Sequence, residues 1–493
     1  MGADKLRVGR AHAPTDQSDS PRFHPRRGER NPAKWAVAGA AILALALAAQ
    51  IPIRARFDGP ARVALGYCVS AALMAGIGLL GRSRRGASHA QSRQGLRIVV
   101  LLATCLLLAN LGPRVVSPGL ALPPRLGTGN AWLVLLGAWA GFVVWIWRTG
   151  ISAGKVAVGL AAAAIASHGL IVITSPFDRL PGDMLWNINR ALTRTLRGDF
   201  PHPDSAPPMT YLPGTWLPYM LPRLAGVDLR VANLLMAGVM LLVAGLANRK
   251  GGNRRFDWWP CLIGMFLLHP TCAYKVANTH FTPSVLAAVC LAITLVAGRP
   301  FAQAVAFGCA LATNQTFLIL APVVWGWWSR PTADSNRSEA GCLRATKWLA
   351  VSMGVFAAAV APLLVWDART FLAQAFFARN DPEIARLAGT FSFFPLVRPF
   401  GTHAGLVCTG LVGLAGLGLA RVVHDAPSVV LLMSGVLCGA LMFQPTSYLH
   451  YFLPAVALAA VSRGAGKTDG VISSKSPRHI VRASQTSTAR SCT

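Results

Sequence analysis

Long apolar runs separated by short polar or basic segments make up most of the chain from residue 34 to residue 463. Most of these runs hold about 18–22 residues, the length that an α-helix needs to cross the hydrocarbon core of a bilayer. We expect membrane-spanning helices at about 34–53, 61–81, 97–113, 130–147, 156–174, 230–248, 258–274, 281–298, 346–366, 403–421, 427–443 and 449–463.

Two further apolar segments do not fit a simple crossing. Residues 301–328 are too long for one span and carry a polar break, Thr313-Asn314-Gln315-Thr316, so we expect two half-length helices that form a hairpin. Residues 213–224 have no room to cross between their neighbours and should form a re-entrant or interfacial helix covered by protein. The sequence therefore predicts an all-α, polytopic integral membrane protein with about 12–14 transmembrane helices.

Basic residues indicate the side of the membrane on which each loop lies. Arginine and lysine are concentrated in the linker 82–97, after Asn248 and in the terminal segments, as in cytoplasmic loops. We therefore expect a multi-pass protein of the cytoplasmic (inner) membrane with both termini in the cytoplasm and no cleavable signal peptide. The expected parts are basic disordered tails at 1–33 and 464–493, four accessory helices at 34–155, and a membrane core at 156–463 with outer loops at 175–229 and 367–402.

Composition supports the membrane assignment. Hydrophobic residues make up 53% of the chain and charged residues only 13%, whereas a soluble protein has roughly a quarter. The net charge of +29 raises the question of nucleic acid. The basic residues lie mostly in tails and short loops, however, so we expect no nucleic-acid binding. The ten cysteines are scattered without a CxxC pair and are expected to be packing residues.

The stretch from Ser175 to Pro222 concentrates acidic residues and an amphipathic helix. Residues 183–197 place apolar side chains on one face and arginines on the other, as in a helix that lies in the membrane interface. We expect this loop to be the working site. Four of the 18 acidic residues lie in it: Asp178, Asp183, Asp199 and Asp204.

A carboxylate beside basic residues suits a transfer reaction. A general base removes a proton from an acceptor hydroxyl while arginines hold a phosphate leaving group. Asp183 is the preferred base and Asp178 the second, although Asp183 could simply cap the helix and Asp178 could pair with Arg179. The arginines of the helix are either phosphate ligands or head-group anchors. They are Arg190, Arg194 and Arg197.

Further candidate substrate-binding residues lie near the predicted outer ends or at the hairpin break. Each of them taken alone is more typical of a packing or interface residue than of a ligand. No phosphate-binding glycine loop, zinc spacing or Ser/His/Asp signature is evident, and no metal is called for, although a divalent ion would be compatible. The candidates are Tyr211, His280, Gln315, Asp367, Arg379 and His450.

The order of these elements resembles the GT-C superfamily of polyprenyl-phosphate-sugar-dependent glycosyltransferases, and most closely its bacterial mannosyl- and arabinofuranosyltransferase-like members. The resemblance covers roughly residues 156–463. It rests on an outer-loop acid at Asp183, a helix that ends at Arg197-Gly198, and the aromatic-proline segment Tyr211-Leu212-Pro213. Later segments that look like the family's hairpins and closing span are Asn278–Pro283, Gly298–Pro300, Leu311–Gln315, Trp366–Phe371 and His450–Pro454.

This chain also departs from the family pattern. Gly214 stands where relatives often have a second proline, and Asn314 stands where many have a basic residue. Some relatives have paired acids where Asp183 stands alone. These departures bear on donor-phosphate binding and on activity itself.

The resemblance implies an inverting hexosyl or pentosyl transfer on the non-cytoplasmic face. The donor would be a polyprenyl-phosphate sugar, the acceptor an envelope glycan, lipid or protein, and no cofactor would be required. Two alternatives remain open. A transporter or lipid flippase should show inverted repeats or ionisable residues within its spans, and an inactive membrane scaffold would tolerate changes throughout the acidic loop.

Overall fold

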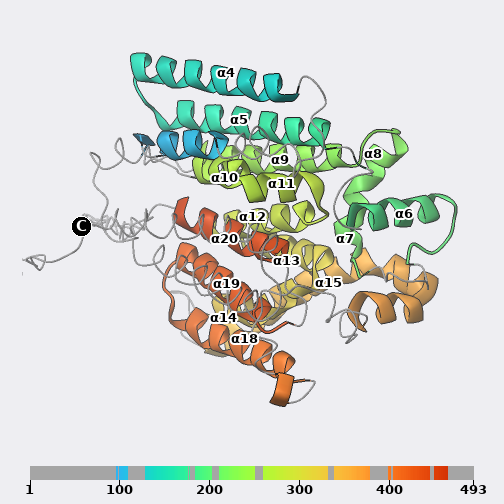
Figure 1. Cartoon of the computed structure of the whole chain (residues 1–493). Coiled ribbons are helices and arrows are strands. Elements are labelled where there is room, and N and C mark those ends of the chain that lie inside the picture. Colours follow the sequence, from blue (N-terminus) through green and yellow to red (C-terminus); the bar gives the residue numbers. More distant parts are fainter. Residues whose placement is uncertain are drawn as a thin grey trace, which may run out of the picture.

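The computed structural model describes only part of the chain. Its regular structure is helical throughout, with no strand in the part described, so the predicted all-α class is confirmed (Figure 1). The expected spans at 34–53 and 61–81 lie outside the described residues, as does nearly all of both expected tails. The described residues are 96–97, 99–108, 128–175, 177, 184–202, 210–249, 259–330, 338–377, 398–400, 403–444 and 449–464.

The main helices follow the predicted apolar runs closely at several places and break them at others. Short 3₁₀ segments occur at η2 (Leu217–Tyr219), η3 (Gln315–Leu320), η6 (Arg398–Phe400) and η7 (Leu449–Phe452), and a π-helical turn at η4 (Ala373–Phe377). The α-helices are α4 Thr128–Thr149, α5 Ala153–Thr174, α6 Met184–Leu196, α7 Pro213–Trp216, α8 Met220–Leu224, α9 Arg230–Arg249, α10 Trp259–Leu268, α11 Pro270–Asn278, α12 Thr282–Val296, α13 Pro300–Thr313, α14 Ala321–Trp328, α15 Ser338–Leu372, α18 Ala404–Val422, α19 Ala426–Leu441 and α20 Leu453–Gly464.

Three helical stretches in the described ranges are long and apolar enough to cross a membrane. They are Ala153–Thr174, Ala340–Ala375 and Ala404–Val422. Cys272–Asn278 and Thr282–Val296 form a fourth if the two helices, bent by 114°, are counted as one broken span. The other apolar helical stretches are 10–17 residues long, among them Leu133–Thr149 within α4 and Arg230–Leu246 within α9. By length and composition these are the helices of a membrane protein, although fewer are full-length spans than the about 12–14 expected.

Proline explains part of this difference. The run predicted as one span at 258–274 is two helices, α10 and α11, that meet at His269. Pro270 is the first residue of α11, and it has no N–H with which to continue the helix before it. The prediction of one unbroken span there was wrong, because it followed the apolar composition and did not include the break that Pro270 imposes.

The hairpin predicted for residues 301–328 is confirmed. α13 ends at Thr313, and Asn314 takes an extended backbone conformation (φ −155°, ψ 121°). The Asn314 side-chain oxygen accepts hydrogen bonds from the N–H and the hydroxyl of Thr316, at 3.0 and 2.9 Å. The indole N–H of Trp328 in α14 then donates to the side-chain oxygen of Gln303 in α13 at 2.8 Å, which joins the two open ends.

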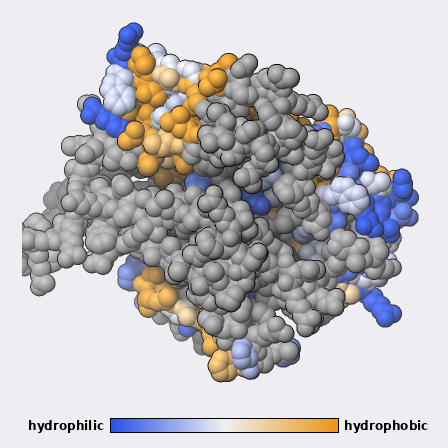
Figure 2. All heavy atoms as spheres, viewed as in Figure 1, coloured by the Kyte–Doolittle hydropathy of each residue, from blue (hydrophilic) through white to orange (hydrophobic). Residues whose placement is uncertain are grey.

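α12 lies in the middle of the helical bundle. It packs against α9, α13, α19 and α20, and most of its side chains are buried. Large apolar side chains are instead exposed on the peripheral helices α4 and α18, which suits contact with lipid. Figure 2 shows hydrophobic residues over α4 and hydrophilic residues at the end of the bundle where α6 lies.

The predicted amphipathic helix is present as α6. Leu185, Ile188 and Leu192 are buried in a small core shared with Trp216 and Tyr219, apart from the main core of the bundle. The segment 213–224 forms the short elements α7, η2 and α8, none of which is long enough to cross a bilayer, as predicted. These elements and α6 gather at one end of the bundle, on the right in Figure 1.

Candidate functional site

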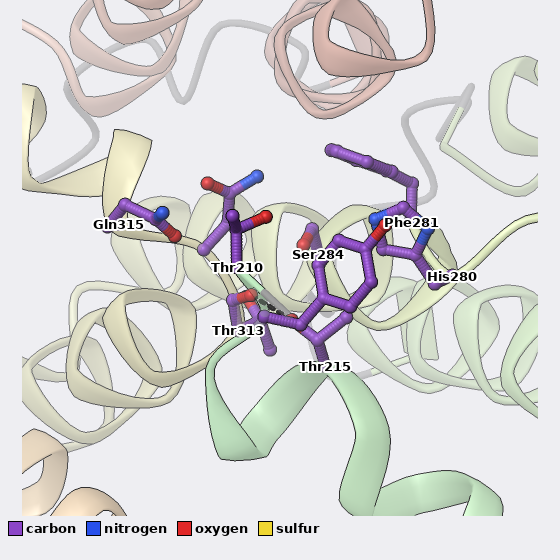
Figure 3. A pocket seen from close by; sticks show the side chains of 9 residues that line it. Thr210, Thr215, His280, Phe281, Ser284, Thr313 and Gln315 are labelled. Atoms are coloured by element: carbon purple, nitrogen blue, oxygen red, sulfur yellow. Dashed lines mark hydrogen bonds between the residues drawn. The ribbon is translucent and has the colours of Figure 1, made fainter. Parts of the chain in front are cut away.

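The re-entrant segment docks directly onto the broken end of α13. A Cβ atom added to Gly214 would lie 2.7 Å from the carbonyl oxygen of Ala312, so only glycine allows this approach. The Thr215 hydroxyl donates a hydrogen bond to the carbonyl of Thr313, where α13 stops and leaves its last carbonyls without helical partners (Figure 3). Gly214 therefore has a packing reason in this chain.

This docking closes one side of a small polar pocket. The space at this pocket is about 190 Å³, including the part open to its surroundings, and its interior has room for about one water molecule. Figure 3 shows Gln315 at one side of the pocket and His280 at the other, with Thr210 and Ser284 between them. The hydroxyl and amide side chains in its wall are those of Thr210, Thr215, Ser284, Thr313, Asn314 and Gln315.

Aromatic rings form the other part of the wall and continue beyond it. The ring centroids of Tyr211 and His280 are 4.1 Å apart, and those of His280 and Phe281 are 4.5 Å apart. Phe281 in turn lies 4.8 Å from Tyr451 of η7. The row of rings thus connects the segment before α7 with the segment before α20. Ring faces of this kind pack against the apolar C–H faces of a bound ligand.

Three of the sequence-predicted residues meet in this pocket, which we call the Tyr211–His280 pocket. Tyr211 precedes α7, His280 lies in the turn between α11 and α12, and Gln315 opens η3. His280 is 2% exposed. The Gln315 amide also donates to the carbonyl of Ala375 at 3.0 Å, which connects the pocket wall to η4, the π-helical turn after α15.

A buried polar network positions the turn that carries His280. The Tyr219 hydroxyl donates to the side-chain oxygen of Asn233 at 2.7 Å, and the Asn233 amide donates to the carbonyls of Ala277 and Thr279 at 2.9 and 3.1 Å. These carbonyls lie at the end of α11, where the helix no longer supplies donors. Burial raises the pKa of Tyr219 far above its ordinary value, so this hydroxyl keeps its proton.

None of the remaining predicted residues is among the described residues of the pocket wall. Asp178, Asp183 and Arg379 lie outside the described residues, and so does the side chain of His450, whose backbone belongs to η7. Asp367 interrupts α15 with an extended backbone (φ −155°, ψ 88°), and its carboxylate accepts a hydrogen bond from the Thr370 N–H at 3.0 Å. Its structural role is to start the last turns of that helix.

The arginines of α6 are placed differently from one another. The Arg194 side chain donates to the carbonyl of Phe200 at 2.8 Å, and the N–H of Asp199 donates back to the Arg194 carbonyl at 3.0 Å. Arg194 therefore closes the turn that follows α6, which leaves fewer of its N–H groups for a ligand. Arg190 is half-buried and Arg197 is exposed.

Sequence reasoning missed a buried arginine at the base of the acidic loop. Arg230 is 3% exposed and forms an ion pair with Asp228, with both carboxylate oxygens within 3.0 Å of its Nε. The Nη2 of Arg230 also donates to Asp228. Its Nη1 donates to the carbonyl of Ser175 and, at 3.1 Å, to the side-chain oxygen of Asn278. Arg230 thus fixes the end of α5, where the loop toward Asp178 begins. An arginine two residues after an aspartate at the start of an apolar run was the available signal.

The described residues in the wall of the Tyr211–His280 pocket present hydrogen-bonding groups and aromatic faces, and none of these residues is a carboxylate, lysine or arginine. Such a surface suits an uncharged, hydroxyl-rich group, because a charged group would lose its hydration there without an ionic partner. Among the side chains that the structure places, no three His, Cys, Asp or Glu residues gather closely enough to hold a metal ion.

Comparison of the chain with protein-family models, with curated proteins and with solved structures finds no match.

Proposed function

We propose that this protein is a membrane glycosyltransferase that moves a sugar from a polyprenyl-phosphate carrier to an acceptor hydroxyl. The observation that carries the proposal is the meeting of Tyr211, His280 and Gln315 in one pocket. These residues come from three segments far apart in the sequence, and each stands out as a polar residue near an expected outer end or helix break. The resemblance to the GT-C superfamily motivates the choice of reaction.

The chemistry of the pocket supports a sugar as its occupant. Hydroxyl and amide groups such as those of Ser284 and Gln315 pair with sugar hydroxyls, and the rings of Tyr211 and His280 can pack against a sugar face. The present interior has room for about one water molecule. Sugar binding therefore requires the walls of the pocket to move apart.

The acidic loop supplies the proposed base. α6 begins at Met184, the residue after Asp183, and Arg230 holds Ser175 at the other end of the loop. Eight residues of chain therefore separate Ser175, whose carbonyl is bound by Arg230, from Asp183, which directly precedes α6. We assign Asp183 the role of general base toward the acceptor hydroxyl and Asp178 the role of second candidate.

The test is sugar transfer in proteoliposomes that contain the purified protein. Polyprenyl-phosphate mannose and polyprenyl-phosphate arabinofuranose serve as donors, and a mixture of envelope glycans and lipids serves as acceptor. The wild-type protein should transfer sugar, and Gln315→Leu should reduce transfer by about tenfold, the effect of one lost hydrogen bond. Asp199→Asn, an exposed position in the turn after α6, is the matched control and should transfer normally. Absence of transfer from both donors would remove the main support of the proposal.

One observation favours a transporter as the second candidate. α11 and α12 meet at an angle of 114°, and α13 breaks at Asn314, so two interrupted helices end beside the Tyr211–His280 pocket. Interrupted helices of this kind line substrate sites in many transporters. Proteoliposomes loaded with labelled sugar distinguish the two, since a transporter moves the unmodified sugar across the membrane without forming a glycosidic bond.

A further inference from the structure

A second and larger pocket lies between α6 and the segment that leads from α8 into α9. It is an open hollow of about 440 Å³, compared with about 190 Å³ for the Tyr211–His280 pocket. We call it the Arg223 pocket. Its wall is formed by Phe177, Asn189, Arg223, Val227, Asp228 and Leu229.

Arg223 is the basic residue among the described residues of the wall, and it has no ion pair with any carboxylate that the structure places. Asp228 is already paired with Arg230 through both of its oxygens. Arg223 donates from Nη2 to the hydroxyl of Thr193 at 3.0 Å, and none of the carboxylates that the structure places lies within ion-pair distance of it. Arg230 lies behind the wall and offsets the charge of Asp228, so among the described residues the formal charges of Arg223, Asp228 and Arg230 sum to one positive charge.

The surroundings of the pocket are apolar and exposed. On α8, the segment that carries Arg223, Leu221 and Leu224 are 77% and 62% exposed. On α6, which carries Asn189, Trp186 is 59% exposed. α6 and α8 are short helices at one end of the bundle (Figure 1), where apolar side chains beside arginines are typical of the membrane interface. Within the wall itself, Phe177 and the 48% exposed Val227 form an apolar rim beside the guanidinium of Arg223.

We propose that the Arg223 pocket binds the phosphate group of a membrane phospholipid. A phosphodiester carries one negative charge, which matches the charge of the wall. The guanidinium of Arg223 presents several N–H donors in a planar fork that fits phosphate oxygens, and the amide of Asn189 supplies another donor. The apolar side chains on α6 and α8 contact the acyl chains. This lipid site is separate from the uncharged Tyr211–His280 pocket and does not depend on sugar transfer.

The test measures lipid binding to the purified full-length protein in a neutral detergent by native mass spectrometry. Phosphatidylglycerol should bind the wild-type protein more tightly than diacylglycerol with the same acyl chains, which lacks the phosphate. Arg223→Gln should weaken phosphatidylglycerol binding by roughly ten- to a hundredfold, as expected for a lost charge-assisted contact, and leave diacylglycerol unchanged. Equal phosphatidylglycerol binding by the wild type and the variant overturns the proposal.

Two matched variants separate charge from packing. Thr193→Val removes the hydrogen bond to Arg223 and keeps the charge, so it should retain lipid binding within a few-fold of the wild type. A loss as large as that of Arg223→Gln would show that Arg223 acts through the packing of α8 and would refute the assignment. Arg148→Gln removes an exposed charge from the last turn of α4, away from this pocket, and should bind lipid normally. If Arg223→Gln does not fold, Arg223→Lys takes its place. It keeps the positive charge but not the planar fork, so it should bind phosphatidylglycerol more weakly than the wild type and still more tightly than diacylglycerol, and unchanged phosphatidylglycerol binding contradicts the proposal.

A final arm distinguishes a lipid from free phosphate. Radiolabelled inorganic phosphate is added to the detergent-solubilised protein in place of lipid. The apolar rim predicts that phosphate alone binds at least tenfold more weakly than phosphatidylglycerol, because it leaves the rim without acyl chains. Equal affinity would make this a site for free phosphate and would overturn the lipid assignment.

Discussion

Gly214 and Ala312 touch backbone to backbone, with no room between them for even a methyl group. A Cβ atom on Gly214 would lie 2.7 Å from the carbonyl oxygen and 2.8 Å from the carbonyl carbon of Ala312. The contact joins the re-entrant α7 to the last turn of α13. Since Tyr211 lies three residues before Gly214 and Gln315 three residues after Ala312, this approach sets the width of the Tyr211–His280 pocket.

Replacing Gly214 with alanine should therefore push α7 away from α13. The obstructing atoms are backbone and cannot swing aside, so we expect a loss of about 1–3 kcal/mol in stability, as for other overpacked sites. Thermal unfolding in detergent measures this as a lower midpoint. Gly238→Ala in α9 is the control, because its added methyl group meets no atom within 4 Å and alanine favours helix. Equal midpoints for the two variants would show that the Gly214 contact is not tight.

Arg230→Gln should destabilise the protein more than any exposed arginine variant. The change removes the partner of Asp228 and a donor to the carbonyl of Ser175 at the end of α5. Loss of one partner of a buried ion pair typically costs about 3–5 kcal/mol, and we expect the lower part of that range because the Asp228 side chain is 30% exposed. Denaturant unfolding in mixed micelles provides the measurement. Arg299→Gln, at an exposed site before α13, should change stability by less than about 0.5 kcal/mol.

Tyr219 should make the protein sensitive to alkaline pH. Burial raises its pKa in the folded state, whereas the unfolded side chain ionises near pH 10. Above pH 10 the unfolded state loses this proton and the folded state keeps it, so the contribution of Tyr219 to stability is full below pH 10 and falls as the pH rises.

The variant Tyr219→Phe isolates this effect. The wild type should lose up to about 1.4 kcal/mol of stability per pH unit above pH 10 relative to the variant. Near pH 7 the variant itself should be less stable by about 1–3 kcal/mol, because the side-chain oxygen of Asn233 loses its donor. Parallel stability curves for the two proteins from pH 9 to pH 11 would contradict the buried, protonated state.

The helices were predictable where an apolar run is uninterrupted. α4, α5, α9 and α18 lie within a few residues of their predicted bounds, because twenty apolar residues in a row have one favourable arrangement in a bilayer. The break at Asn314 was also predictable, since consecutive polar residues in a long apolar run need local partners. The break at His269 was missed, although Pro270 marked it.

The composition of the pocket was predictable only residue by residue. A polar side chain near the end or break of an apolar helix is costly unless it has a partner or a function. Three such residues stand out in the sequence: Tyr211, His280 and Gln315. Their meeting depends on how α7, α12 and α13 pack, and no local pattern encodes that packing. Asn233 was missed for a similar reason. It reads as one polar residue at the start of an apolar run, and only the carbonyls that it contacts explain it.

Asp183→Asn separates an enzyme from a transporter or a scaffold. An acceptor hydroxyl is a poor nucleophile near neutral pH, so a carboxylate should take its proton as the bond to the sugar forms. Asparagine matches aspartate in size and still caps a helix that begins at Met184, but it cannot accept that proton. Folding should be almost unchanged, while turnover in the proteoliposome assay should fall by about 10²–10⁴-fold.

The control for Asp183→Asn is Asp199→Asn, which removes a carboxylate from the exposed turn at the other end of α6. Both variants lose one negative charge beside the same helix, so a change in the net charge of the loop would affect them alike. Only a base at position 183 predicts that the first loses turnover while the second keeps it. Wild-type turnover in Asp183→Asn would reduce Asp183 to a helix cap and make Asp178 the next residue to test, because it lies in the same loop three residues after the carbonyl that Arg230 holds.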